Sequence, residues 1–255
     1  MRPPALLASL LIGATLLPSA PGAWAQEVNA PAANAPGANP AAGLVLFPDR
    51  YRAVIGNPPA AGSREEADDL AILRWNQRSR YPEGVVHSWR FLYRNLSSFD
   101  AAVGSDLSKT SPTLFTGLPS FLKAIDGLKD QLKDAAARPR PYVSHQEFQP
   151  CLPLESTWSY PSGHATWYAA TAQLLADLLP ERRERLLQVG LQGGYARSYC
   201  GVHYPSDVLA SQRLAAAVAK DVIASPQWQS FKGQVQPEVQ KLLVAPPAGL
   251  PLLTD

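Results

Sequence analysis

The sequence predicts an all-α protein, a compact helical bundle. Three observations predict it: apolar residues recur at helical spacing in several segments, a capping-box pattern opens one of these segments, and no convincing run of alternating apolar and polar residues indicates a strand. With 46% hydrophobic and 17% charged residues in 255 positions, the chain is sufficient for one sizeable domain with a core. We therefore expect helices packed on helices, with a functional site at helix N-termini and loops.

The first predicted helix opens at residues 63–66, SREE, where a serine cap precedes a glutamate by three positions. It continues through DDLAILRWNQRSR. A second helix is predicted over residues 117–137. Its apolar stripe consists of Phe121, Leu122, Ile125, Leu128 and Leu132.

Three more helices are predicted in the second half. One begins within SYPSGHATW, residues 159–167, and ends before Pro180. The next covers residues 181–199 and contains glycines suited to close helix packing, and the last starts near Ser206. The apolar stripe of the helix that begins within residues 159–167 is Trp167, Thr171, Leu174, Leu175 and Leu178. The apolar stripe of the last helix is Leu214, Val218 and Val222.

The two ends of the chain differ from this pattern. Arg2, the apolar stretch ALLASLLIGATLLP and AWA at residues 23–25 predict a signal peptide over residues 1–25, cut before Gln26, with an uncleaved anchor helix as the alternative. Residues 26–43 are low-complexity Ala, Pro, Asn and Gly, which predicts a flexible tether. One domain is expected over residues 44–244, followed by an irregular tail over residues 245–255.

Charge and cysteine content narrow the function classes. The net charge is +2, and the leader contributes Arg2 and no acid, so the remainder carries 2 − 1 = +1. This balance argues against a nucleic-acid polymer as partner, and any anion must bind a local cluster of cations. In an exported chain Cys151 and Cys200 are expected to form a disulfide, with two buried free thiols as the alternative. The absence of a Cys-x-x-Cys motif argues against a zinc site.

Unusual polar residues of the second half fall into three ordered motifs, K-x6-R-P, P-S-G-H and R-x5-H-x3-D. The residues in them are Lys133, Arg140, Ser162, Gly163, His164, Arg197, His203 and Asp207. If these motifs converge, the three cations hold an anion, the glycine permits close backbone approach, and the helix start after Ser162 aims N–H groups at it. The set then forms a site for a doubly charged tetrahedral oxyanion.

The remaining residues of the motifs suit proton and group transfer. His203 and Asp207 stand four positions apart, so that Asp207 can bond one imidazole nitrogen and leave the other as a nucleophile. His164 is then the general acid. Taken alone, each residue has a plainer interpretation. Asp207 is then a first-turn acid, Lys133 or Arg140 a solvated charge, and His164 or His203 a structural or surface histidine. His87 and His145 are interpreted as bystanders, with His145 also a candidate for the pocket rim.

The ordered motifs resemble the signature of the type 2 phosphatidic acid phosphatase superfamily. That superfamily includes the bacterial class A nonspecific acid phosphatases and shares its site with vanadium haloperoxidases. SYPSGH and R-x2-C-G-x-H-x3-D are most similar to the class A enzymes, in which the cysteine of the last motif pairs with one upstream of P-S-G-H. Cys151 and Cys200 fit that arrangement.

The resemblance implies a phosphohistidine on His203, oriented by Asp207, with His164 protonating the departing alcohol and then activating water. Lys133, Arg140, Ser162, Gly163 and Arg197 are implied to hold the phosphoryl oxygens, with no metal and no cofactor. The sequence departs from the family pattern at Ala196, Ala165 and Trp158, where the family has serine, threonine and glycine. We expect these changes to affect substrate range rather than the catalytic set, and Trp158 to favour aromatic or nucleotide leaving groups.

The predicted function is therefore an exported, metal-independent acid phosphatase that hydrolyses small phosphomonoesters, with phosphotransferase side activity as a further expectation. Phosphate and vanadate are expected inhibitors, and the location is expected to be periplasmic or secreted. A soluble lipid-phosphate phosphatase is the main alternative. A vanadate-dependent haloperoxidase and a non-catalytic phosphate-binding protein are others, and a homo-oligomer stays open.

Overall fold

The computed structural model describes residues 39–243, and every regular element in that range is a helix, which confirms the predicted fold class. In chain order the elements are α1 (Pro48–Ile55), α2 (Arg64–Ser79), α3 (Pro82–Arg90), the 3₁₀ turn η1 (Leu96–Phe99), α4 (Asp100–Val103), α5 (Leu107–Thr110), α6 (Pro112–Ala136), α7 (Pro141–Ser144), α8 (Gly163–Leu178), the 3₁₀ turn η2 (Pro180–Arg182), α9 (Arg183–Tyr199), α10 (Pro205–Ile223) and α11 (Pro226–Leu243).

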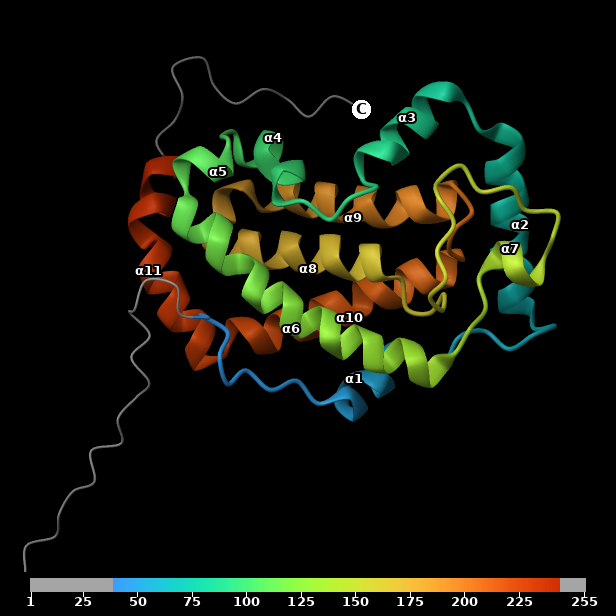
Figure 1. Ribbon diagram of the computed structural model, residues 1–255, viewed down its shortest axis with the longest axis horizontal. Coiled ribbons are helices and arrows are strands. Elements are labelled where there is room, and N and C mark those ends of the chain that lie inside the picture. Colours follow the sequence, from blue (N-terminus) through green and yellow to red (C-terminus); the bar gives the residue numbers. More distant parts are fainter. Residues whose placement is uncertain (1–38, 244–255) are drawn as a thin grey trace, which may run out of the picture. The chain divides into compact units, whose positions relative to one another are not determined.

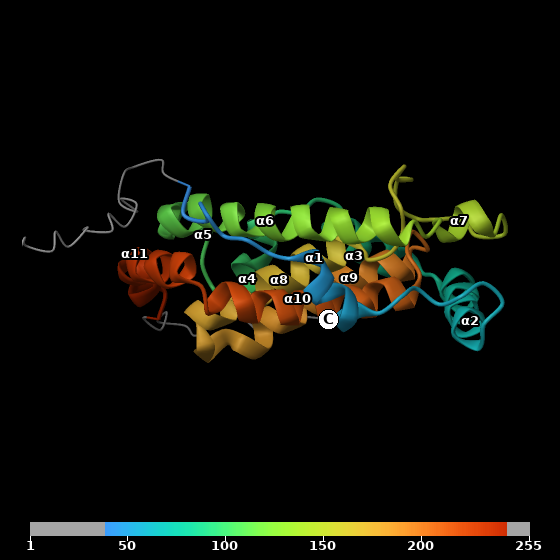
Figure 2. The same ribbon diagram turned by 90° about the horizontal axis from the view of Figure 1, so that it is seen from below.

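Helix α8 is the centre of the bundle. It packs against α9, α10 and α6, and Figure 1 shows it between α9 and α10 with α6 crossing in front. Figure 2 shows α6 as a separate layer on one side of these three helices. Most residues of α8 are buried and apolar, as expected for a helix surrounded by others. The N-terminus of α8 is thereby fixed at one end of the bundle.

Glycines of α9 allow the close approach of α8 and α9. A Cβ atom at Gly193 would lie 2.2 Å from Tyr168 Cγ, and one at Gly190 would lie 2.7 Å from Ala172 Cβ. Neither position can carry a side chain without moving α8, since real Cβ atoms do not approach so closely. This packing holds the end of α9 level with the start of α8.

The capping predictions agree with the structure. Ser63 caps α2 by accepting a hydrogen bond from Glu66 N at 3.1 Å, and Ser162 caps α8. The helices α1, α3 and α11 were not predicted from the sequence. Each of these three helices begins with a proline at its first position, where the fixed φ of proline and its missing N–H suit a helix start.

The N-terminal boundary of the domain lies earlier than predicted. Residues 39–43, assigned to the tether, form a turn in which Ala41 is buried in the core and Ala42 O accepts from Gln227 Nε2 at 3.4 Å. Burial of Ala41 holds this turn against the core. The predicted signal peptide, the rest of the tether and the tail lie outside residues 39–243. Within that range no helix combines the length and apolar character needed to cross a membrane.

Candidate functional site

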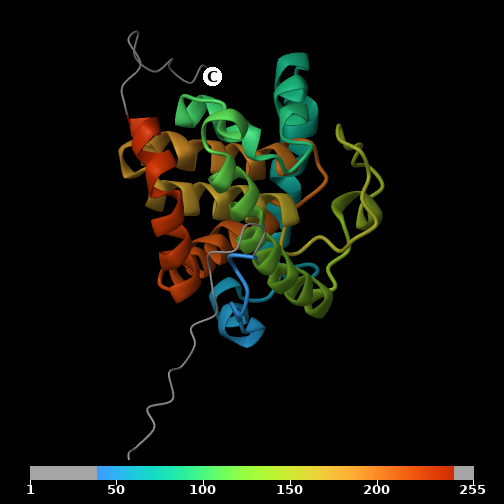
Figure 3. The same ribbon diagram turned by 60° about the vertical axis from the view of Figure 1, so that its left-hand side comes forward.

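The residues predicted to form the site meet at one end of the bundle, where α8 begins. Arg197 lies in the last turn of α9, Asp207 in the first turn of α10, and His203 in the turn between them. Lys133 lies in the last turn of α6 and Arg140 directly precedes α7. Figure 1 shows these helix ends on one side, beside the loop that joins α7 to α8, and Figure 3 shows that loop on the same side as the start of α8. The five side chains are buried.

A disulfide fastens the joining loop to the end of α9. Cys151 and Cys200 are bonded, with their Cα atoms 4.7 Å apart, and Cys151 N donates to Cys200 O at 3.0 Å. The predicted pairing is therefore present. Because Cys200 directly follows α9, the bridge keeps the loop over the buried arginines and histidines of the site.

Asp207 is held by four groups. Its Oδ2 lies 3.3 Å from His203 Nδ1 and accepts from Ser159 Oγ at 2.5 Å and from Tyr204 N at 3.0 Å. Its Oδ1 accepts from Arg138 Nη1 at 2.7 Å. Asp207 is in addition a helix-start acid, because its bond from Tyr204 N forms part of the α10 cap.

The surroundings of His203 assign its tautomer. Arg140 Nη1 lies 3.1 Å from His203 Nε2, and a guanidinium can only donate, so Nε2 accepts and carries no proton. The proton then sits on Nδ1, facing Asp207. Burial, followed by Arg140 and Lys133, lowers the pKa of His203 well below its usual value. The result is a neutral imidazole whose Nε2 is unprotonated and faces Arg140, and an unprotonated ring nitrogen is what a histidine nucleophile requires.

The cationic part of the site consists of Arg140, Arg197 and Lys133, which we call the cradle. Lys133 Nζ donates to Trp158 O at 2.6 Å, and burial, followed by Arg140 and Lys129, lowers the pKa of Lys133 to about 7. Burial also lowers the pKa of Arg197 to about 10. Arg197 Nε and Nη1 have no hydrogen-bond partner among the residues that the structure describes. The cradle therefore has unused donors.

Glu155 places its carboxylate inside the cradle, which sequence reasoning did not predict. Oε2 accepts from Arg140 Nη2 at 2.5 Å, and Oε1 pairs with Arg197 Nη2. Burial would raise the pKa of Glu155, but Arg197 and Arg140 outweigh it and lower the pKa to about 2. In the sequence Glu155 is marked only by lying four residues after Cys151. That position does not show that its carboxylate, rather than that of another acid in the loop, pairs with the two arginines.

His164 faces the same carboxylate from the first turn of α8. Its Nε2 lies 2.9 Å from Leu92 O, which only accepts, so Nε2 carries a proton. Its Nδ1 lies 3.8 Å from Glu155 Oε1. Burial and Arg197 lower the pKa of His164 to about 4, so it is neutral in mildly acidic solution while the cradle holds Glu155. Burial is the largest cause of this lowered pKa, and burial cannot be read from the spacing of the motifs.

Ser162 and Gly163 lie at the start of α8 as predicted. Ser162 Oγ accepts from Ala165 N at 3.4 Å, and its hydroxyl proton remains available to a ligand. A Cβ at Gly163 would meet Lys129 Nζ at 3.6 Å, which is ordinary contact, so the protein itself does not require glycine there. Lys129 is a buried cation beside the cradle that sequence reasoning missed, and it pairs with Asp126 at 3.0 Å.

Two further residues missed by sequence reasoning support Asp207. Arg138 bridges Asp207 to Asp69 of α2, with Nη2 3.0 Å from Asp69 Oδ2. Asp69 also accepts from Ser206 N at 2.8 Å. Nothing in the sequence around Arg138, two residues before Arg140, indicates that it bridges two aspartates. Asp69 also lies far from Arg138 in the sequence.

The histidines interpreted as bystanders lie outside the cradle. His87 Nε2 is 3.1 Å from Gln192 Oε1, and the His145 ring packs against Phe148 and Tyr204. Of the departures from the family pattern, Ala165 and Ala196 are buried, whereas the Trp158 side chain is 43% exposed. The carbonyl of Trp158 holds Lys133.

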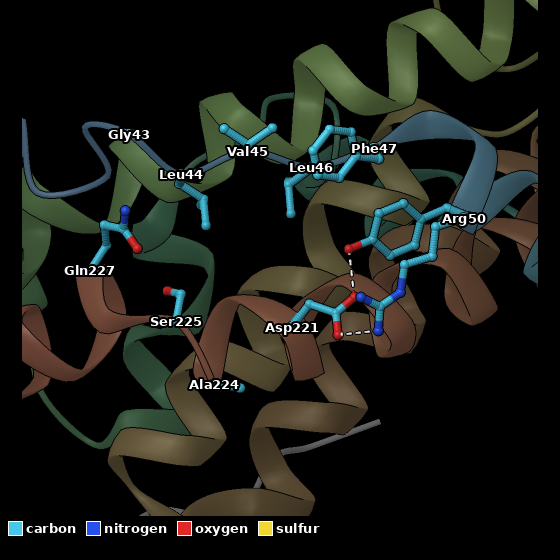
Figure 4. Close-up of a pocket in the computed structure, with 11 residues that line it drawn as sticks. Gly43, Leu44, Val45, Leu46, Phe47, Arg50, Asp221, Ala224, Ser225 and Gln227 are labelled. Atoms are coloured by element: carbon cyan, nitrogen blue, oxygen red, sulfur yellow. Dashed lines mark hydrogen bonds and ion pairs between the residues drawn. The ribbon is translucent and has the colours of Figure 1, made fainter.

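A cavity of about 400 Å³ lies away from this site (Figure 4). It is formed by residues 43–47 against the end of α10, where Arg50 Nη2 and Tyr51 Oη reach Asp221 at 2.8 and 2.6 Å. None of the motif residues lines it. Among residues 39–243, no group of three or more His, Cys, Asp or Glu side chains is arranged to hold a metal ion.

Comparison with known proteins identifies proteins that are similar to this chain. The chain is 43% identical over 172 residues to an acid phosphatase of Zymomonas mobilis subsp. mobilis, covering 63% of this chain and 64% of that protein. It is 30% identical over 149 residues to a non-specific acid phosphatase of Salmonella typhi, covering 55% and 59%. It is 36% identical over 87 residues to a lipid A 1-phosphatase of Rhizobium johnstonii, covering 32% and 36%. The matches thus span less than two thirds of the length of each of these relatives.

The fold is similar to that of the transmembrane PAP2 type phosphatidylglycerolphosphate phosphatase from Bacillus subtilis. The TM-score is 0.51 at 21% identity, covering 74% of this chain and 94% of that one, and such a likeness shows the fold alone. Residues 114–231 match the PAP2 superfamily, and all eight motif residues fall within that range. Over residues 114–231 the chain is thus similar to the PAP2 superfamily.

Proposed function

We propose that this chain is an acid phosphatase that hydrolyses phosphomonoesters through a phosphohistidine on His203. The observation that carries the proposal is the neutral His203, with Nδ1 toward Asp207 and Nε2 toward Arg140 of a cradle that has unused donors. The names of the acid phosphatase relatives support it. The predicted leader supports export, so the proposed location is the periplasm or the medium.

The proposed reaction has two steps. His203 Nε2 attacks phosphorus, the bond to the ester oxygen breaks, and His164 gives that oxygen a proton. Water, deprotonated by His164, then attacks phosphorus, and the bond from phosphorus to Nε2 breaks to release phosphate. A bound phosphoryl group carries more negative charge than the Glu155 carboxylate, so it raises the pKa of His164 and stabilises the protonated acid. The cradle neutralises charge on the phosphoryl oxygens.

Hydrolysis of p-nitrophenyl phosphate in EDTA tests the proposal. Turnover is expected to persist in EDTA, to be inhibited by vanadate, and to be abolished in His203→Ala. His87→Ala is the matched control and is expected to keep the wild-type rate. Near-normal turnover by His203→Ala contradicts the nucleophile assignment. Phosphate binding without turnover of any ester supports a binding protein, and halide oxidation by hydrogen peroxide that needs added vanadate supports a haloperoxidase.

A lipid-phosphate substrate is the second candidate. A cavity of about 380 Å³ is lined by the apolar residues Leu96, Phe115, Leu122 and Trp167, together with Arg94, Asn95, Lys123 and Asp126. Trp167 follows His164 by one turn of α8. The lipid A 1-phosphatase relative is consistent with it. A panel of aryl, sugar, nucleotide and lipid phosphates decides between the two, by whether the lipid phosphate has the highest kcat/KM. Transfer to added alcohols in the same assays measures the proposed phosphotransferase side activity.

A further inference from the structure

Glu155 takes up donors that the proposed function assigns to the phosphoryl group. Its two oxygens engage one Nη2 atom each of Arg140 and Arg197, and Oε1 is the oxygen nearest to His164 Nδ1. A hydrogen on a guanidinium nitrogen that is bonded to Glu155 is not available to a phosphoryl oxygen. Two anions in one desolvated cradle also repel each other. Glu155 and a phosphoryl group therefore compete for the same place.

The carboxylate satisfies the cradle only in part. Arg197 is fully buried, yet its Nε and Nη1 have no partner among the described residues. A carboxylate offers two oxygens, and both are already engaged by the two arginines. A tetrahedral anion offers three free oxygens, and the additional oxygen suits the remaining donors. The cradle is thus better matched to a phosphoryl group than to the side chain that fills it.

Glu155 can leave the cradle without unfolding the loop. Its main chain is fastened by Tyr142, whose Oη accepts from Glu155 N at 3.0 Å and donates to Glu155 O at 2.7 Å. Its side chain is 29% exposed, which gives the carboxylate a path to water. Thr157 also stays on Arg140, through its carbonyl at 2.8 Å and its hydroxyl at 2.9 Å. A change of side-chain rotamer is sufficient to free the donors.

We propose that Glu155 is an internal anion that competes with the phosphoryl group and sets the affinity of the site. The proposal rests on the proposed function and deepens it. In the empty site Glu155 neutralises the arginines, a phosphoryl group displaces it, and its return assists release of product phosphate. The apparent affinity for phosphate is then the intrinsic affinity reduced by the fraction of molecules in which the cradle is open.

Binding of inorganic phosphate to wild type and Glu155→Gln, measured by titration calorimetry, tests this inference. Glu155→Gln removes the competing charge and is expected to bind phosphate at least about tenfold more tightly, equivalent to about 1.4 kcal/mol. Its KM and its inhibition constant for phosphate are expected to fall together. Glu147→Gln is the control, since Glu147 is a half-exposed acid of the same loop, paired with Arg74 at 3.0 Å, and it is expected to match wild type.

Two results overturn the inference. One is phosphate binding by Glu155→Gln that is equal to or weaker than that of wild type. The other is a fall in kcat at unchanged KM, which makes Glu155 a positioning residue for His164. If wild type neither binds phosphate nor hydrolyses any ester, the proposed function fails instead.

A measurement of thermal stability covers the case in which Glu155→Gln folds poorly. Without Glu155 the buried arginines lack a counter-charge, so phosphate is expected to raise the Tm of Glu155→Gln by more than it raises that of wild type. Glu155→Asp keeps the charge on a shorter side chain and is expected to fall between the two. Equal phosphate-induced shifts in all three proteins contradict the proposal.

Discussion

Two buried arginines, Arg138 and Arg197, lie at the same end of the bundle and differ in how completely they are bonded. Arg138 joins Asp69 and Asp207 and stacks 3.6 Å from the centre of the Tyr204 ring. Burial tends to lower its pKa, but Asp207 and Asp69 outweigh this and raise it. Among residues 39–243 the ion-pair partner of Arg197 is Glu155 alone, and burial dominates, lowering the pKa of Arg197 to about 10. The fully bonded Arg138 fixes the orientation of Asp207, whereas the partly bonded Arg197 keeps donors that a ligand can use.

The largest expected effect is on stability, at Arg138. Arg138→Met leaves Asp69 and Asp207 buried without their cation, which is expected to lower the free energy of unfolding by about 3–5 kcal/mol. Urea denaturation measures it. Arg50→Met, which breaks an exposed pair with Asp221, is the control and is expected to cost less than about 1 kcal/mol. Equal losses of unfolding free energy in the two variants would contradict this account, because the buried network around Arg138 would then be no more stabilising than an exposed ion pair.

The next effect is on activity, at Arg197. Arg197→Met is expected to lower kcat/KM for an aryl phosphate by about 10²–10³-fold, because a donor to the developing phosphoryl charge is lost. Its free energy of unfolding is expected to change by less than about 1.5 kcal/mol, since Glu155 keeps its bond to Arg140. A stability loss as large as that of Arg138→Met shows that Arg197 is structural.

A smaller effect concerns pH. Lys133 has a pKa of about 7 in the folded protein, so the cradle loses one positive charge as pH rises through 7. If a protonated Lys133 is needed, kcat/KM falls by about fivefold from pH 7 to pH 8, equivalent to about 1 kcal/mol, and by about tenfold for each further pH unit. Lys133→Arg, whose guanidinium stays charged, is expected to move this fall to higher pH. A wild-type kcat/KM that rises up to pH 9 contradicts this role.

The smallest expected effect lies at the rim of the cradle. Trp158→Gly removes a half-exposed ring but keeps the carbonyl that holds Lys133. Aromatic contacts contribute about 0.5–1.5 kcal/mol, so kcat/KM for aryl phosphate relative to glycerol phosphate is expected to fall by about twofold to tenfold. Kinetics with both substrates measures the ratio. An unchanged ratio means that Trp158 does not contact the leaving group.

The sequence alone was sufficient to predict those helices and site residues that show a regular spacing. The helical stripes predicted α6, α8 and α10, and Ser162 marked the start of α8, because capping and periodicity are local properties. The three motifs predicted the set that meets around His203. That part of the site needed only the chain order and the chemistry of each side chain.

The rest depends on contacts across the fold. Asp69 reaches Arg138 from α2, and Glu155 reaches the arginines from the joining loop, and neither contact has a local sequence signal. The low pKa of His164 follows from burial under that loop, which spacing does not reveal. The proline-initiated helices α1 and α3 were missed because they have only eight and nine residues. The helix α11 has a regular apolar stripe, Trp228, Phe231, Val235, Val239 and Leu242, which the sequence does contain and which was not recognised.

The measurement that tests the account most directly is the capture of the proposed phosphoryl-enzyme. Wild type is mixed with p-nitrophenyl phosphate, quenched in alkali within milliseconds, digested and analysed by mass spectrometry. The account predicts one phosphoryl group on His203, absent from His203→Ala and present in His87→Ala. Steady turnover without any phosphoryl-enzyme, or a phosphoryl group on His164 instead, contradicts the assignment of His203 Nε2 as the nucleophile.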